Sequence, residues 1–282
     1  MKKIQNPKDL HKFMHKFKKN KLAIIGLIVI SGFFLLALFA NLIAPYNPSA
    51  IIENSTQSPS LQHWFGTDEI GRDIFSRILF GARISLSVGF VAVVIAILVG
   101  TVVGAVAGYF GGWVDGGLMR FVDVMLAFPS IFLLLTIQVM LQPNIYNVMV
   151  VIGLTSWMGV ARLVRGEFLV QKERPYVESA RAIGAANSRI IFLHILPNAI
   201  SPIIVAATLG MAGAILTESS LSFLGLGVQP PMPSWGNMLM DAQAYMRDAP
   251  WIAVFPGIFI LLSVLSLYFV GEGLREEFNP KE

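Results

Sequence analysis

Residues 84–109 read ISLSVGFVAVVIAILVGTVVGAVAGY, and the stretch contains no Asp, Glu, Lys or Arg. A helix needs about 20 consecutive apolar residues to cross the hydrocarbon core of a bilayer. This stretch is long enough to do so. Gly100, Gly104 and Gly108 recur within it at four-residue spacing, which predicts a narrow face where a second helix can pack closely.

Similar uncharged runs recur along the chain and predict six spans, near residues 22–44, 84–109, 118–141, 146–164, 199–221 and 251–270. The third and fourth are separated by a short turn at Gln142-Pro143-Asn144. Composition agrees, because only 13% of residues are charged, whereas soluble domains carry about a quarter. The mean hydropathy is +0.68. The predicted fold class is all-α, a polytopic membrane protein with six transmembrane helices.

The distribution of lysine and arginine predicts the orientation. With the N-terminus in the cytoplasm, 17 of the 21 basic residues lie in inner segments, and the outer segments hold Arg72, Arg77, Arg83 and Arg247. Cytoplasmic loops carry an excess of basic residues, so both termini are predicted to be cytoplasmic. The same bias explains the pI of about 9.4 better than binding to nucleic acid does.

The N-terminal segment, residues 1–21, is basic and precedes an apolar run that is too long for a cleaved signal peptide. Leu10, Phe13, Met14 and Phe17 fall at helical spacing among lysines. This pattern suits either an amphipathic helix on the cytoplasmic leaflet or a disordered basic tail, and both remain open.

The most informative polar segment lies between the fourth and fifth spans, where residues 178–197 read ESARAIGAANSRIIFLHILP. The pattern predicts two short helices joined by a turn. Gly184 can adopt the left-handed conformation that ends the first helix, and Asn187 or Ser188 can cap the second. Pro197 would mark the entry into the fifth span. A thin helical hairpin of this kind is suited to fit a groove on another protein.

This segment resembles the EAA loop of bacterial ABC-importer permeases. Ser179 departs from the motif, and His194 stands where the general pattern often has Ile, as in the peptide-importer branch. In that family the loop contains the coupling helix, which docks into a cytoplasmic ATPase. The resemblance implies a coupling loop at 173–197, with these coupling residues: Glu178, Ala180, Arg181, Gly184, Ala185, Leu196 and Pro197.

Two further stretches, residues 65–86 and 219–236, resemble the C-type permeases of dipeptide, oligopeptide and nickel importers. The likeness extends from about Leu22 to Glu277. It implies the ABC type I importer permease fold, with a permease domain at 22–277 and a cytoplasmic tail at 278–282. It also implies an outer-loop motif made of Gly66, Thr67, Asp68, Gly71, Arg72 and Asp73.

The resemblance implies a subunit of the bacterial inner membrane that forms half of a translocation pathway for di- or oligopeptides. A nickel or other small-solute importer is the alternative, followed by a secondary transporter. The implied partners are a homologous second permease in a heterodimer, two cytoplasmic P-loop ATPases, an extracytoplasmic substrate-binding protein and the lipid bilayer. No glycine is followed by lysine, so the chain lacks a phosphate-binding P-loop. ATP and magnesium would bind to the partner subunits, and no cofactor is expected on this chain.

Three groups of polar residues near the spans are candidates for a functional role. Arg120 and Asp123, three residues apart, favour a mutual ion pair over a substrate contact. Glu218 is a candidate pathway or partner contact, and a helix-end cap is equally compatible. The Asp68–Asp73 cluster has only His63 nearby, so a structural turn or docking to the binding protein is favoured over a metal site. The four histidines are scattered and cysteine is absent, so no catalytic residue is predicted.

Overall fold

The structure is a computed structural model that describes residues 17, 19–52, 54–141 and 144–278. The predicted amphipathic segment around Leu10, most of the turn at Gln142-Pro143-Asn144 and the tail after Phe278 lie outside these residues. Within the described ranges the regular structure is helical, apart from an isolated bridge between Thr67 and Asp73.

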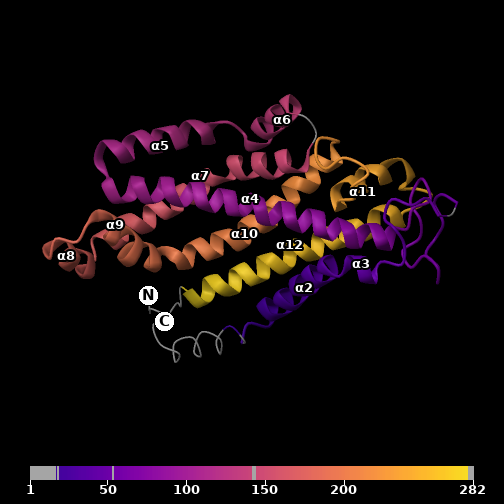
Figure 1. The fold of residues 1–282 in the computed structure, drawn as a ribbon, viewed down its shortest axis with the longest axis horizontal. Coiled ribbons are helices and arrows are strands. Elements are labelled where there is room, and N and C mark those ends of the chain that lie inside the picture. Colours follow the sequence, from indigo (N-terminus) through magenta and orange to yellow (C-terminus); the bar gives the residue numbers. More distant parts are fainter. Residues whose placement is uncertain (1–16, 18, 53, 142–143, 279–282) are drawn as a thin grey trace.

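The helices form an elongated bundle (Figure 1). Five helical runs are long and apolar enough to cross a membrane, and one bent pair gives a sixth candidate. In chain order the elements are α2 (Lys21–Leu38), α3 (Ala40–Ile43), α4 (Ile74–Phe110), α5 (Gly112–Ala127), α6 (Ser130–Met140), α7 (Ile145–Lys172), α8 (Pro175–Ala182), α9 (Asn187–Arg189), the π-helical turn η1 (Ile190–Ile195), α10 (Leu196–Phe223), α11 (Trp235–Ala242), the 3-10 turn η2 (Gln243–Tyr245) and α12 (Trp251–Phe278).

The glycine ridge of α4 is a packing face against α7, as predicted. A Cβ atom built on Gly100 would lie 2.6 Å from the Cβ of Val160, and one on Gly108 would lie 2.6 Å from the Cβ of Phe168. Gly104, between them, faces the α7 backbone equally closely. The two helices touch along this ridge because no side chain separates them.

Helix α2 packs antiparallel along α12. Near one end the Asn20 side chain donates to Glu276 at 2.9 Å, and further along the rings of Phe33 and Phe259 stack 5.0 Å apart. The opposite face of α2 exposes large apolar side chains, as expected for a lipid-facing surface: Leu22, Ile25, Ile28, Leu35 and Leu38.

The third predicted span is broken, which corrects the prediction of one continuous helix near 118–141. Helices α5 and α6 meet at an angle of 83°. The break falls at Phe128 and Pro129, where Phe128 is extended with ψ of 131°. Proline lacks a backbone N–H and disfavours helical geometry in the preceding residue, so the helix stops there.

The two ends of the bundle differ. The hairpin formed by α8 and α9 projects at one end, whereas α11 and residues 45–52 and 54–73 lie at the other (Figure 1). We call these the hairpin end and the α11 end.

Candidate functional site

The hairpin turn is built by a Schellman motif at the end of α8. The Gly184 N–H donates to the Arg181 carbonyl at 2.9 Å, and the Ala185 N–H donates to the Ala180 carbonyl at 3.0 Å. Gly184 has a φ of +78°, as predicted for a left-handed helix terminus. Such a φ is costly for residues with a Cβ, which explains glycine at this position.

One face of α8 fixes the hairpin to the bundle. Val177 is fully buried and Ala180 nearly so, in a cluster with Val164, Phe168 and residues of η1 and α10. The Arg181 guanidinium lies 5.7 Å from the centre of the Tyr109 ring of α4. The hairpin base is therefore tied to α4, α7 and α10 together.

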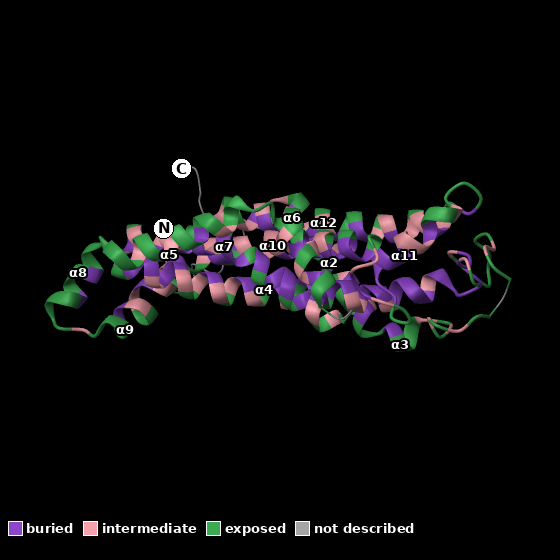
Figure 2. Ribbon diagram, turned by 90° about the horizontal axis from the view of Figure 1, so that it is seen from above, coloured by how far each residue is buried: buried purple, intermediate pink, exposed green. Residues whose placement is uncertain are grey.

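The tip of the hairpin is free of intramolecular packing (Figure 2). Ile183 is 85% exposed, and a Cβ on Gly184 would meet no atom within 4 Å. Of the other predicted coupling residues, Glu178 and Pro197 are exposed, whereas Leu196 and Ala185 are half-buried. An exposed apolar side chain beside an open turn forms a projection that another protein can receive.

The predicted cap of the second hairpin helix is wrong. Ala186 occupies the N-cap of α9 with no side-chain hydrogen bond, and the Asn187 side chain instead accepts from the Tyr109 hydroxyl at 2.7 Å. Pro197 lies in the first turn of α10, as predicted for the entry into the fifth span, but the helix does not start afresh there, because residues 187–223 form one continuous helical run. A π-helical turn precedes the proline, and the Leu196 N–H donates to the Ile191 carbonyl within it. The wider turn accommodates a residue that has no N–H to donate.

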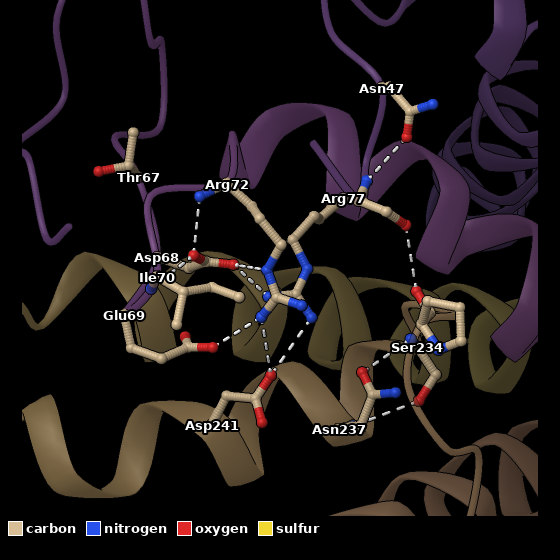
Figure 3. A network of polar contacts seen from close by, with 12 residues as sticks. Asn47, Thr67, Asp68, Glu69, Ile70, Arg72, Arg77, Ser234, Asn237 and Asp241 are labelled. Atoms are coloured by element: carbon tan, nitrogen blue, oxygen red, sulfur yellow. Dashed lines mark hydrogen bonds and ion pairs between the residues drawn. The ribbon is translucent and has the colours of Figure 1, made fainter. Parts of the chain in front are cut away.

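The predicted outer-loop motif lies at the α11 end and forms a buried ionic network (Figure 3). The Asp68 carboxylate accepts from Arg72 Nε at 2.6 Å and also from Arg77 Nη1. The carboxylate of Asp241, on α11, is 3.2 Å from Arg77 Nη2. Burial and the neighbouring Asp68 carboxylate raise the pKa of Glu69, although its Oε1 lies 2.6 Å from Arg72 Nη2.

The rest of the motif shapes the loop and starts α4. Asp73 caps α4 by accepting from the Ser76 N–H at 2.8 Å, and its other oxygen is 2.9 Å from His63 Nδ1. Gly66 and Gly71 have φ values of +79° and +86°. The Thr67 hydroxyl donates to the Asn54 carbonyl at 3.0 Å. The polar side chains of the motif are thus hydrogen-bonded within the chain. Among the described residues no group of three His, Asp or Glu side chains is placed to hold a metal.

Sequence reasoning missed Arg77 and Asp241 as members of this network. Asp241 lies 164 residues after Arg77, so no local spacing signals the contact.

Glu218 is predicted as a candidate pathway or partner contact. The structure corrects this prediction, because the Glu218 side chain has 0% exposure within the chain. Its carboxylate accepts from the hydroxyls of Ser85 at 3.0 Å and Ser222 at 2.8 Å. Ser222 follows Glu218 by four residues on the same helix, so its spacing indicates a possible contact. Ser85 lies on α4, and no local spacing indicates its contact with Glu218.

Asp123 pairs with Arg162 of α7 and not with Arg120. Arg165, one turn after Arg162, pairs with Asp115 through a contact of 2.6 Å. These ion pairs join α5 to α7, so the predicted pair within α5 is replaced by pairs between helices.

Comparison with known proteins agrees with this architecture. Residues 100–281 match the family model described as "Binding-protein-dependent transport system inner membrane component". Residues 10–63 match the model of the N-terminal TM domain of oligopeptide transport permease C.

Curated relatives and a solved structure cover most of the chain. A dipeptide transport system permease protein DppC of Alkalihalophilus pseudofirmus is 49% identical over 94% of this chain and 88% of the relative. A glutathione transport system permease protein GsiD of Shigella flexneri is 47% identical over 96% and 90%. A structure of the MetNI methionine ABC transporter in an inward-facing conformation shares the fold, with a TM-score of 0.60 and 17% identity over 72% of this chain and 96% of that chain. The chain therefore belongs to the family of binding-protein-dependent transport system inner membrane components, and it has the ABC importer permease fold.

Proposed function

We propose that this chain is a permease subunit of a peptide importer and forms half of its translocation pathway. The observation that carries the proposal is the similarity over nearly the whole chain to permeases named for dipeptide and for glutathione, which is itself a short peptide. Nickel or another small solute remains the second candidate, because the motif at 65–86 resembles both branches.

The proposed assembly contains a homologous second permease, two cytoplasmic ATPases that bind ATP and magnesium, and an extracytoplasmic binding protein. The chain would lie in the bacterial inner membrane with both termini and the hairpin end in the cytoplasm. The α11 end would then face the binding protein.

The hairpin is the proposed contact with the ATPase, with Ile183 and Gly184 at its tip. Residues 187–223 form a continuous run of 37 residues, about 55 Å long at 1.5 Å per residue. When the ATPase groove that holds the tip moves, α10 would therefore move with it. Because α8 is also packed on α4 and α7, the three helices would reorient together.

The test is uptake by the reconstituted importer in proteoliposomes, with ATP hydrolysis measured in parallel. We expect Gly184→Trp to insert normally, to retain ATP hydrolysis and to lose coupled uptake. Ile183→Asp separates docking from backbone strain, because Ile183 has a φ of −87°, and it should have the same effect. Gly32→Trp is the control, since Gly32 lies on α2 with no atom near its Cβ position. Normal uptake by both hairpin variants would overturn the coupling role.

The substrate class is tested in the same vesicles with labelled di- and tripeptides and with labelled nickel. ATP-dependent uptake of peptides alone is the expected result. Uptake of nickel without peptides would leave the importer intact and refute the peptide assignment.

A further inference from the structure

The chain folds back on itself after α10. Residues 224–250, here the fold-back segment, return toward the bundle, and their helix α11 packs against α4, α10 and α12. Trp235 is fully buried and Met238 is 1% exposed. The middle of the segment, residues 233–238, is thus embedded in the α11 end, whereas residues 230–232 and 246–248 are exposed on its surface.

A carboxylate lies beneath this segment. Glu218 Oε2 accepts from Ser85 of α4 and Oε1 accepts from Ser222 of α10, and the glutamate has no exposed surface. No ion pair of Glu218 with a cationic side chain occurs in the part of the chain that the structure describes. We call Glu218, Ser85 and Ser222 the serine cluster. A buried carboxylate without a cationic partner is costly unless its oxygens are hydrogen-bonded, so these hydroxyls are essential to its burial.

The same two hydroxyls hold the fold-back segment. Ser222 Oγ accepts from the Val228 N–H at 3.0 Å, and Ser85 Oγ accepts from the Trp235 N–H at 3.3 Å. A serine hydroxyl can donate one hydrogen bond and accept others. Each serine therefore donates to Glu218 while it accepts from the segment, so the carboxylate orients both hydroxyls toward their backbone partners.

Two glycines permit this close approach. A Cβ built on Gly236 would lie 2.6 Å from the Cα of Ser219, and one built on Gly227 would overlap the Ser222 hydroxyl. Both glycines belong to the fold-back segment and both face the turn of α10 that carries Glu218. This packing is independent of the hydrogen bonds and places the segment on the same site.

We propose that Glu218 is a positioning residue that fixes the fold-back segment to α4 and α10 through Ser85 and Ser222. The inference rests on the proposed function in one respect, because it assigns the fixed surface to the binding protein. Helix α10 carries the hairpin at its other end. The serine cluster would therefore hold the surface that contacts the binding protein in a fixed position relative to α10, the helix that the ATPase moves.

The attachment is tested first without any substrate. The chain has no cysteine, so Ala242→Cys on α11, where Ala242 is fully buried, provides a unique label site. In the assembled importer we expect Glu218→Met and Ser222→Ala to raise the rate of labelling by a membrane-impermeant maleimide about tenfold, because each leaves a buried polar group unpaired.

Two matched variants separate hydrogen bonding from volume. Glu218→Gln can still exchange hydrogen bonds with hydroxyls that rotate, so it should label at nearly the parental rate. Ser220→Ala, which removes an exposed hydroxyl bonded to the Leu216 carbonyl, should have no effect. Unchanged labelling in Ser222→Ala and Glu218→Met would overturn the proposal, as would equally fast labelling of the Gln and Met variants. If Glu218→Met does not assemble, the Ser222→Ala result decides.

The positional role is tested by titrating the binding protein against ATP hydrolysis. Ser222→Ala should raise the half-saturating concentration of the binding protein severalfold while the maximal rate stays near the parental value. A lower maximal rate at unchanged half-saturation would refute positioning of the docking surface. The labelling result depends on neither substrate nor binding protein, so its failure is distinguishable from failure of the proposed function.

Discussion

Substitution of Gly104 by alanine tests the helix contact on which the bundle depends. The added Cβ would lie 2.8 Å from the Cβ of Val164 and 2.9 Å from the backbone nitrogen of Arg165, and closer still to the Ala161 carbonyl oxygen. Ordinary contacts of this kind begin at 3.4 Å. Two of the three neighbours are backbone atoms, so a side-chain rotation cannot relieve the overlap, and α7 must move away from α4.

The expected cost follows from two opposing effects. Overpacking in a close-packed interior costs about 1–3 kcal/mol, whereas alanine favours a helix over glycine by about 1 kcal/mol. The net loss in the free energy of unfolding should be about 0–2 kcal/mol. In a thermal melt of the detergent-solubilised chain this corresponds to a fall of up to about 6 °C in Tm.

Gly32→Ala is the control, because its Cβ would meet no atom within 4 Å. It should leave Tm unchanged or raise it slightly through helix propensity. If Gly104→Ala melted at the same temperature as Gly32→Ala, the close approach of α4 and α7 along the glycine ridge would be refuted.

Three further predictions concern charged side chains. Asp68→Asn should destabilise the chain by about 3 kcal/mol, because two buried arginines lose a shared charge partner; a melt within 1 °C of the parental Tm would contradict the network. The pKa of Glu69 is raised in the folded chain, so folding favours its protonated form. This contribution to stability is fully present below the pKa of Glu69 in the unfolded chain and is lost as pH rises through its pKa in the folded chain. Glu69→Gln should therefore match or exceed the parental Tm at pH 7–8, and the difference should shrink toward pH 4; a Gln variant that is less stable only at neutral pH would reverse the sign. Asp123→Asn should cost about 0–1 kcal/mol, because Asp123 and Arg162 are 56% and 52% exposed, and a larger fall in Tm would show that this pair holds α5 in place.

Local signals predicted much of the candidate site. A left-handed residue at the end of a helix is usually glycine, and this preference depends only on that residue and its immediate neighbours. The sequence alone therefore indicated the turn at Gly184. The π-helical turn before Pro197 was not predicted, because its geometry depends on the packing that keeps the helix continuous through the proline. Pro129 was a visible helix breaker, but hydropathy alone gave one span there, since the apolar run continues past the break.

The helical class, the apolar runs and the glycine face of α4 could be predicted from the sequence, because each depends on composition or on spacing along one helix. Which polar groups meet depends on the packing of the helices and could not be predicted. Asp68 joins Asp241 through two arginines, and Glu218 joins Ser85, across 133 residues. Such partners share no local pattern, and they come together because helices that are distant in sequence pack side by side and leave no water to satisfy their buried polar groups.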